Sequence, residues 1–253
     1  MEKQIKERIQ WLDTIRGITI ISMVLYHWVW DMVYIAGADW PWFQSDFAYM
    51  WQQSICWSFI LLSGFCWSLG KNKWKHGLVV SAGGLLVSIV TFIFTPGERI
   101  VFGVLTFLGA AMLLMIPLEK MLHKVPEKIG FMVSFLFFLF TKGINNGYLG
   151  IGEIELIKLP KYLYHQGYIM TFLGWRDDSI FTTDYFSLIP WIFLFMAGYF
   201  IYEILKGYKW LDKKKICSKK IIPFHVIGRY SLEIYLLHQP IIYGGVMIGK
   251  LFE

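Results

Sequence analysis

The sequence predicts an all-α membrane protein: a polytopic transmembrane helical bundle of about seven spans, with a cytoplasmic N-terminus. Of its 253 residues, 56% are apolar, 19% aromatic and only 17% charged, with a mean hydropathy of +0.50. A soluble domain carries about 25% charged residues. Apolar stretches long enough to cross a bilayer recur along the chain, and basic residues gather in alternate connections. The net charge of +6 therefore indicates topology, and we expect no nucleic-acid partner.

Seven apolar stretches meet the length of about 17–25 residues that a transmembrane helix needs. The fifth is the shortest. We expect one integral-membrane domain over residues 1–253 with an external loop at about 143–184, in which residues 161–173 form a short interfacial helix. The predicted spans are 12–34, 46–69, 76–95, 100–117, 128–142, 185–205 and 221–247.

The distribution of lysine and arginine orients these spans, because cytoplasmic loops carry an excess of both. With the N-terminus inside, most of the 24 basic residues lie on the inner side, whereas the outer connection 35–45 has none. Seven spans then place the C-terminus outside. The inner basic residues are Lys3, Lys6, Arg8, Lys71, Lys73, Lys75, Lys120, Lys124, Lys128, Lys206, Lys209, Lys213, Lys214, Lys215, Lys219 and Lys220.

The first span carries four ionisable residues on one helical face: Asp13, Arg16, His27 and Asp31. Arg16 and His27 are separated by roughly 16 Å along the helix axis, at about 1.5 Å per residue. Ionisable groups at membrane depth are costly, and they usually mark a functional site. The structural alternative is a buried polar group satisfied by neighbouring helices, but four such groups on one face are more than packing requires.

His27 and Asp31 have the one-turn spacing of a general base and the carboxylate that orients it. A neutral imidazole can take a proton from an attacking hydroxyl or amine, and a carboxylate fixes its tautomer and stabilises the imidazolium. The same two residues could form a proton relay in a transporter.

The last predicted span brings a second histidine to a similar depth in the outer half of the bilayer. His238 shares a helical face with Ser231 and Tyr235. Its structural alternative is a hydrogen bond to a backbone carbonyl left open by Pro240, which has no N–H to donate. The remaining histidines and Cys56, Cys66 and Cys217 show no metal-ligand spacing, so we expect no metal.

Two further sets of candidate site residues can also be explained by helix structure alone. Ser63 and Gly64 permit close helix packing. Asp184 precedes the sixth span, where an acidic residue can cap the helix that follows.

Several short motifs resemble one family. The motifs are L-D-T-I-R-G at 12–17, S-G-F at 63–65, G-V-L-T-F-L-G at 103–109, D-Y-F-S-L-I-P-W at 184–191 and G-R-Y-S-L-E-I-Y-L-L-H-Q-P at 228–240. With ten residues between Arg16 and His27, this set resembles bacterial proteins similar to the catalytic domain of heparan-α-glucosaminide N-acetyltransferase, in the transmembrane acyltransferase superfamily. The resemblance spans nearly the whole chain. It implies acetyl-CoA as the donor, entering from the cytoplasm, and a sugar or glycan acceptor on the outer side.

The resemblance also implies roles for the candidate residues. The lysosomal relative's catalytic histidine lies just beyond its first helix, and this chain has no histidine between 28 and 75, so His27 becomes the candidate base and Asp31 its orienting carboxylate. The expected donor-binding residues are Asp13, Arg16, Ser63 and Gly64. The expected acceptor-binding residues are Asp184, Tyr235, His238 and Gln239.

The expected location is a bacterial cytoplasmic (inner) membrane, with lipid as a constant partner, and the resemblance leaves a homodimer open. The rival interpretation is a small multi-pass transporter or permease that uses the Arg16, His27 and Asp31 face as its pathway. A third is a non-enzymatic membrane subunit. The absence of a visible inverted repeat counts against the transporter.

Overall fold

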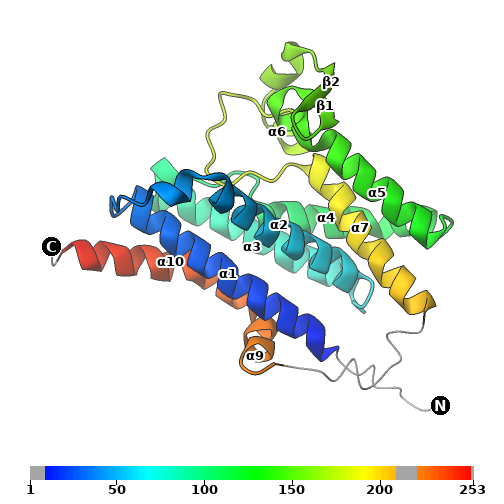
Figure 1. Cartoon of the computed structure of the whole chain (residues 1–253), viewed down its shortest axis with the longest axis horizontal. Helices are drawn as coiled ribbons and strands as arrows, with labels where there is room; N and C mark the ends of the chain where they lie inside the picture. Colours follow the sequence, from blue (N-terminus) through cyan, green and yellow to red (C-terminus); the bar gives the residue numbers. More distant parts are fainter. Residues whose placement is uncertain (1–8, 209–220, 252–253) are drawn as a thin grey trace. The chain divides into compact units, whose positions relative to one another are not determined.

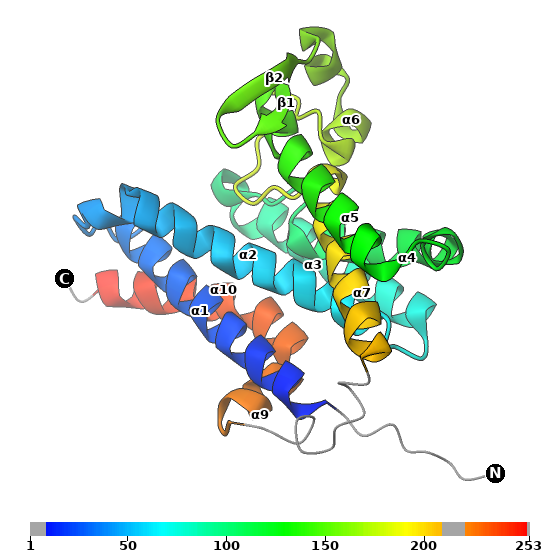
Figure 2. The same cartoon turned by 45° about the vertical axis from the view of Figure 1, so that its right-hand side comes forward.

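Long helices account for most of the residues that the computed structural model describes, which are 9–208 and 221–251 (Figures 1 and 2). The chain divides into two compact units. Unit 1 contains Met1–Phe59 and Leu205–Glu253, and unit 2 contains Ile60–Ile204. Unit 1 is therefore built from the two ends of the chain.

Unit 1 is organised around α1 (Gln10–Tyr34), which packs against both α9 (Phe224–Arg229) and α10 (Ser231–Lys250). Both views show α10 running beside α1 (Figures 1 and 2). The short helix η1 (Pro41–Gln44) leads into α2 (Asp46–Trp67), whose first part belongs to this unit. Ile20, Met23 and Ile55 form a buried cluster between α1 and α2.

The last apolar stretch differs from the single span predicted at 221–247. It forms two helices, because the chain leaves helical geometry at Tyr230, with φ −105° and ψ 29°. The short α9 packs on the N-terminal half of α1, and the longer α10 continues after the break. Sequence periodicity missed this break because no proline or glycine occupies the position.

Unit 2 contains the remainder of α2 with α3 (Lys73–Phe94), α4 (Val104–Leu122), α5 (Glu127–Thr141) and α7 (Leu188–Gly207). The short helix η2 (Pro96–Glu98) joins α3 to α4. α3 lies along α4 at close range: a Cβ added to Gly109 would lie 2.2 Å from the Ser81 hydroxyl oxygen. Lys73 closes the other end with an ion pair to Glu119 at 2.7 Å.

Helices occupy each of the seven predicted apolar segments. Among the described residues, four segments are long and apolar enough to cross a membrane by length and composition: α3, α4, Glu127–Asn146 and α7. The count of seven spans and the cytoplasmic N-terminus stay predictions. The basic residues within 1–8 and 209–220, on which the orientation partly rests, lie outside the described residues.

The segment predicted as an external loop contains a β-hairpin, so the description all-α needs a correction there. After η3 (Lys142–Asn146), strands β1 (Tyr148–Ile151) and β2 (Ile154–Lys158) pair antiparallel. Gly152 supplies the positive φ of +61° that the tight turn requires. The expected helix at 161–173 is present in two pieces, η4 (Lys161–His165) and α6 (Tyr168–Leu173), separated by Gly167 at φ +72°.

Candidate active site

Two histidines from opposite ends of the chain meet in unit 1. The rings of His27 on α1 and His238 on α10 have centroids 4.8 Å apart and planes inclined by 59°. This contact agrees with the similar depth that the sequence predicts for the two residues. Tyr235 lies beside the pair, with its ring centroid 5.4 Å from that of His238. The two imidazoles therefore form the centre of a candidate proton-transfer site.

The tautomer of His238 is fixed by its own helix. Its Nδ1 lies 2.6 Å from the Tyr235 carbonyl oxygen, and a carbonyl can only accept, so Nδ1 carries the hydrogen. The neutral ring then has a lone pair on Nε2. That atom is buried and has no hydrogen-bond partner among the described residues, and the whole residue is 8% exposed. The carbonyl that Nδ1 contacts is that of Tyr235. Pro240 leaves open a different carbonyl, that of Leu236 four residues before it, so Pro240 does not explain this hydrogen bond.

A hydrogen bond between Asp31 and Gln239 also joins α1 and α10. Asp31 lies one turn beyond His27 on α1, and Gln239 directly follows His238 on α10. The Gln239 side-chain nitrogen donates to Asp31 Oδ1 at 2.9 Å, and Asp31 is fully buried. Because a carboxylate accepts this hydrogen bond, the amide oxygen of Gln239 faces elsewhere. That oxygen is buried and has no partner within the described part of the chain. The site thus presents two buried acceptor atoms, on His238 and Gln239.

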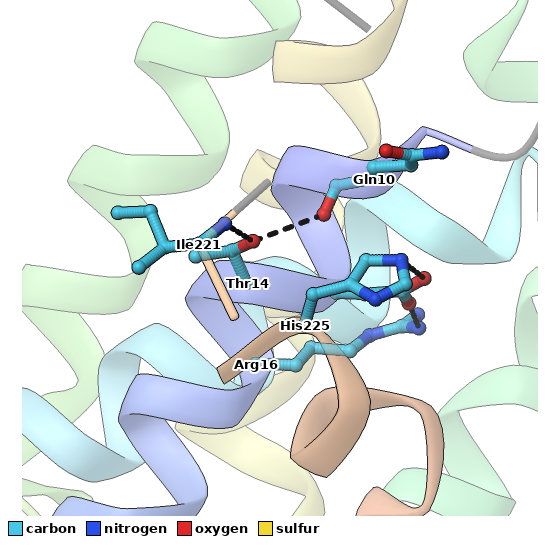
Figure 3. Close-up of polar contacts among 6 residues, drawn as sticks. Gln10, Thr14, Arg16, Ile221 and His225 are labelled. Atoms are coloured by element: carbon cyan, nitrogen blue, oxygen red, sulfur yellow. Dashed lines mark hydrogen bonds and ion pairs between the residues drawn. The ribbon is translucent and has the colours of Figure 1, made fainter. Parts of the chain in front are cut away.

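A second polar cluster lies at the N-terminal half of α1 (Figure 3). Asp13 is 2% exposed, and Arg16 Nη1 lies 3.3 Å from its Oδ1. His225 on α9 brings its Nε2 to 4.0 Å from Asp13 Oδ2. Sequence reasoning missed His225, since it shares no spacing with α1 and lies in a short helix after Pro223. Asp13 consequently faces two basic side chains.

Two glycines allow α9 to lie close against α1 at this N-terminal cluster. A Cβ on Gly17 would lie 2.0 Å from the Phe224 carbonyl oxygen, and one on Gly228 would lie 1.7 Å from the Asp13 carbonyl oxygen. Only residues without a side chain allow the two backbones to approach so closely. The Thr14 hydroxyl contributes a further link, because it accepts from the Ile221 N–H at 3.3 Å and donates to the Gln10 carbonyl at 3.2 Å (Figure 3).

Three of the predicted site residues lie in unit 2. Ser63 and Gly64 are on the second part of α2, where a Cβ on Gly64 would lie 2.0 Å from the Phe195 carbonyl oxygen of α7. Gly64 therefore permits a close helix crossing, the structural alternative given above. The donor-binding role of Ser63 and Gly64 stays a prediction.

Asp184 lies at the beginning of α4, and not at the helix that follows it in sequence. Its Oδ2 accepts a hydrogen bond from the Val104 N–H at 3.3 Å. The interpretation of Asp184 as the cap of the sixth span is therefore wrong, because the segment around 182–186 runs back beside 101–104 and pairs with it. Burial raises the pKa of Asp184 from its ordinary 3.8 to about 6.

Among the described residues, no group of three or more histidine, cysteine, aspartate or glutamate side chains could hold a metal ion. The chemistry available in unit 1 is that of imidazole, carboxylate, amide and guanidinium groups. Such a set can move a proton and bind an anion.

Long apolar helices are those of a helical membrane protein, and the contact between His27 and His238 marks its candidate site. The chain belongs to the family described as heparan-alpha-glucosaminide N-acetyltransferase, catalytic, whose sequence profile matches residues 8–240. This confirms the resemblance seen in the motifs and makes the protein a member of a membrane acetyltransferase family. No curated protein and no solved structure matches the chain.

Proposed function

We propose that this protein is an acyltransferase of the bacterial cytoplasmic membrane that moves an acetyl group from cytoplasmic acetyl-CoA to a sugar or glycan on the outer side. Membership of the acetyltransferase family supports the reaction class. The contact between His27 and His238 at 4.8 Å is the observation that carries the assignment to unit 1.

His27 is the proposed general base, which removes the proton from the attacking amine or hydroxyl of the acceptor. Asp31 is the proposed orienting carboxylate, one helical turn away, and Gln239 holds it in place. Tyr235, His238 and Gln239 line the acceptor side, and the buried amide oxygen of Gln239 suits the N–H and O–H groups of a sugar. Asp184 is proposed at the outer mouth.

Arg16 is the proposed binding residue for the phosphates or the pantetheine carbonyls of the donor, supported by Asp13. Its distance from His27 along α1 is about 16 Å, a length that an extended pantetheine arm covers. The ion pair with Asp13 positions the guanidinium before the donor binds. Ser63 and Gly64 remain proposed as further donor contacts.

The donor assignment is tested by thermal unfolding of the purified protein in detergent. A ligand that binds only the folded state stabilises it by mass action, by about 2.7 kcal/mol at a concentration of 100 Kd. Acetyl-CoA at millimolar concentration should therefore raise the Tm, and Arg16→Ala should remove that rise. The Tm of Arg16→Ala without ligand should be lower than that of the wild type, because the buried Asp13 loses its ion pair.

An unchanged wild-type Tm would favour the transporter over the acyltransferase.

A separate experiment identifies the acceptor: surface glycans from cells with and without the protein are compared by mass spectrometry. A mass difference of one acetyl group identifies the modified sugar, and identical glycans in both would contradict transfer to the cell surface.

A further inference from the structure

We propose that His238 acts as the proton partner of His27: its Nε2 takes up the proton that His27 removes from the acceptor, and later returns it. The proposal rests on the acyltransferase function above. Because His238 acts through His27 in this step, it is a positioning residue for the base.

The state of the His238 ring carries the argument. Its Nδ1–H is engaged by the Tyr235 carbonyl at 2.6 Å, so the second nitrogen must be a hydrogen-bond acceptor in the neutral ring. Buried polar atoms are satisfied in the great majority of cases, and an exception calls for an explanation. Nε2 of His238 is such an exception among the residues described here.

His27 is the neighbour that can use this acceptor. Its ring centroid lies 4.8 Å from that of His238, and the terminal torsion of a histidine rotates over a broad range at small cost. A modest rotation therefore aims an N–H of His27 at Nε2 of His238. Asp31 Oδ1 receives the amide N–H of Gln239, and in this proposal the carboxylate orients and stabilises the histidine pair through its negative charge and not through a hydrogen bond to the second nitrogen of His27.

The transfer balances with the two substrates alone. The acceptor atom X bonds to the thioester carbonyl carbon, and the carbon–sulfur bond breaks with its electron pair going to sulfur. The proton of X moves to one nitrogen of His27, while the N–H on the other nitrogen of His27 moves to Nε2 of His238. The proton then returns through His27 to the coenzyme A thiolate, which leaves both histidines neutral.

The Tyr235 carbonyl stabilises the protonated form of His238. While His238 holds the extra proton, its Nδ1–H becomes a charged donor, and hydrogen bonds from charged donors are stronger than neutral ones. The positive charge is therefore held one residue away from the reacting atoms, where it does not oppose the positive charge that develops on an attacking amine.

The test is acetyl transfer from acetyl-CoA to glucosamine, a probe that offers both an amine and hydroxyls, by the full-length protein in detergent. His238→Ala should lower the rate by about 10²-fold, within the range for a positioned proton-transfer group, and added imidazole should restore part of it. Restoration should increase with the basicity of substituted imidazoles.

His238→Gln keeps a polar side chain but removes the basic nitrogen. In mixtures of light and heavy water, the wild-type rate should depend on deuterium fraction along a curve, since two protons move together. The same plot for His238→Gln should be a straight line, and this measurement decides the question if His238→Ala does not fold.

His76→Ala is the matched control. His76 also places its Nδ1 against a carbonyl of the preceding turn, that of Asn72 at 2.9 Å, but lies at the start of α3, and its loss should change neither the rate nor the deuterium dependence. The relay is overturned if His238→Gln keeps the wild-type rate, if its deuterium plot remains curved, or if folded His238→Ala that still binds acetyl-CoA is not restored by imidazole. A wild-type protein that transfers no acetyl group to any acceptor would overturn the proposed function instead.

Discussion

A buried polar atom without a partner costs about 1–3 kcal/mol of folding free energy, and α10 carries two of them, on neighbouring residues His238 and Gln239. A chain that keeps such atoms in place of apolar ones gives up stability for a site that is ready before its ligand arrives. At the scale of single residues, these two acceptors support the proposed role of α10 in the acyltransferase site.

The first residue-scale prediction concerns His27 and Asp31. His27→Ala should lower acetyl transfer by about 10²–10⁴-fold, the usual contribution of a positioned base, with folding and the acetyl-CoA-induced Tm rise intact. Asp31→Asn should be slower than the wild type, because the amide keeps the shape but not the negative charge that stabilises an imidazolium. Steady-state kinetics check both. Full activity in His27→Ala would assign the base to another residue.

The second residue-scale prediction concerns pH and Asp184. Its folded pKa of about 6 is above its ordinary 3.8, so the folded state binds the proton more tightly than the unfolded state. Its contribution to stability is therefore complete below about pH 4 and is lost as the pH rises through 6, a change of up to about 3 kcal/mol. Asp184→Asn should flatten the decline in Tm between pH 4 and 7.

Asp178→Asn provides the control for this pH series, because Asp178 is exposed and lies in the same loop. It should retain the slope of the wild type. Equal slopes in Asp184→Asn and the wild type would show that another group titrates over this range.

At the scale of elements, the sequence predicts where helices form better than how they meet. Apolar length locates the helices in all seven predicted segments. The contact between Asp31 and Gln239 joins residues 208 positions apart, and no helical periodicity within one segment contains that information. His225 shows the same limit, since only packing of α9 on α1 brings it to Asp13.

The missed hairpin has a different cause. The apolar residues of 148–158 alternate with glycine and charged residues around Gly152, which is the local pattern of two strands joined by a tight turn. The strongly apolar composition of the whole chain predicts helices, and it masks this local two-residue period. The hairpin could therefore be found by testing each loop separately for the two-residue period.

The crossing of α1 and α9 gives an element-scale prediction. Gly17→Ala and Gly228→Ala should each destabilise the protein by about 1–3 kcal/mol, as overpacking does, because the new Cβ atoms would meet backbone carbonyls. Both should also weaken the Tm rise with acetyl-CoA, since α9 carries His225 to Asp13. Thermal unfolding with and without acetyl-CoA measures both effects.

Gly244→Ala is the corresponding control within α10. A Cβ there meets no atom within 4 Å, and alanine is favoured over glycine inside a helix by about 0.5–1 kcal/mol. This variant should be as stable as the wild type or more so. Equal losses at Gly17 and Gly244 would contradict the close crossing.

At the scale of the whole molecule, orientation is the claim that the lysine distribution makes most directly. In a background without native cysteines, Glu153→Cys at the turn of the hairpin should react with a membrane-impermeant maleimide on intact cells. Lys71→Cys, before α3, should react only after the membrane is permeabilised. Both positions are exposed. The reverse labelling pattern would invert the topology and place the N-terminal cluster of Asp13, Arg16 and His225 on the outer side.

Unit 1 draws its helices from both ends of the chain, and this has a consequence for biosynthesis. α1 leaves the ribosome before α10, so the buried Asp31 has no amide from Gln239 until the chain has grown by a further 208 residues. During that interval the charged face of α1 must be tolerated by lipid or by the insertion machinery. A chain that stops before α10 would keep a charged helix without its packing partner, and we expect the cell's quality control to degrade it. The synthesis of α10 thus decides when the polar face of α1 acquires its partner.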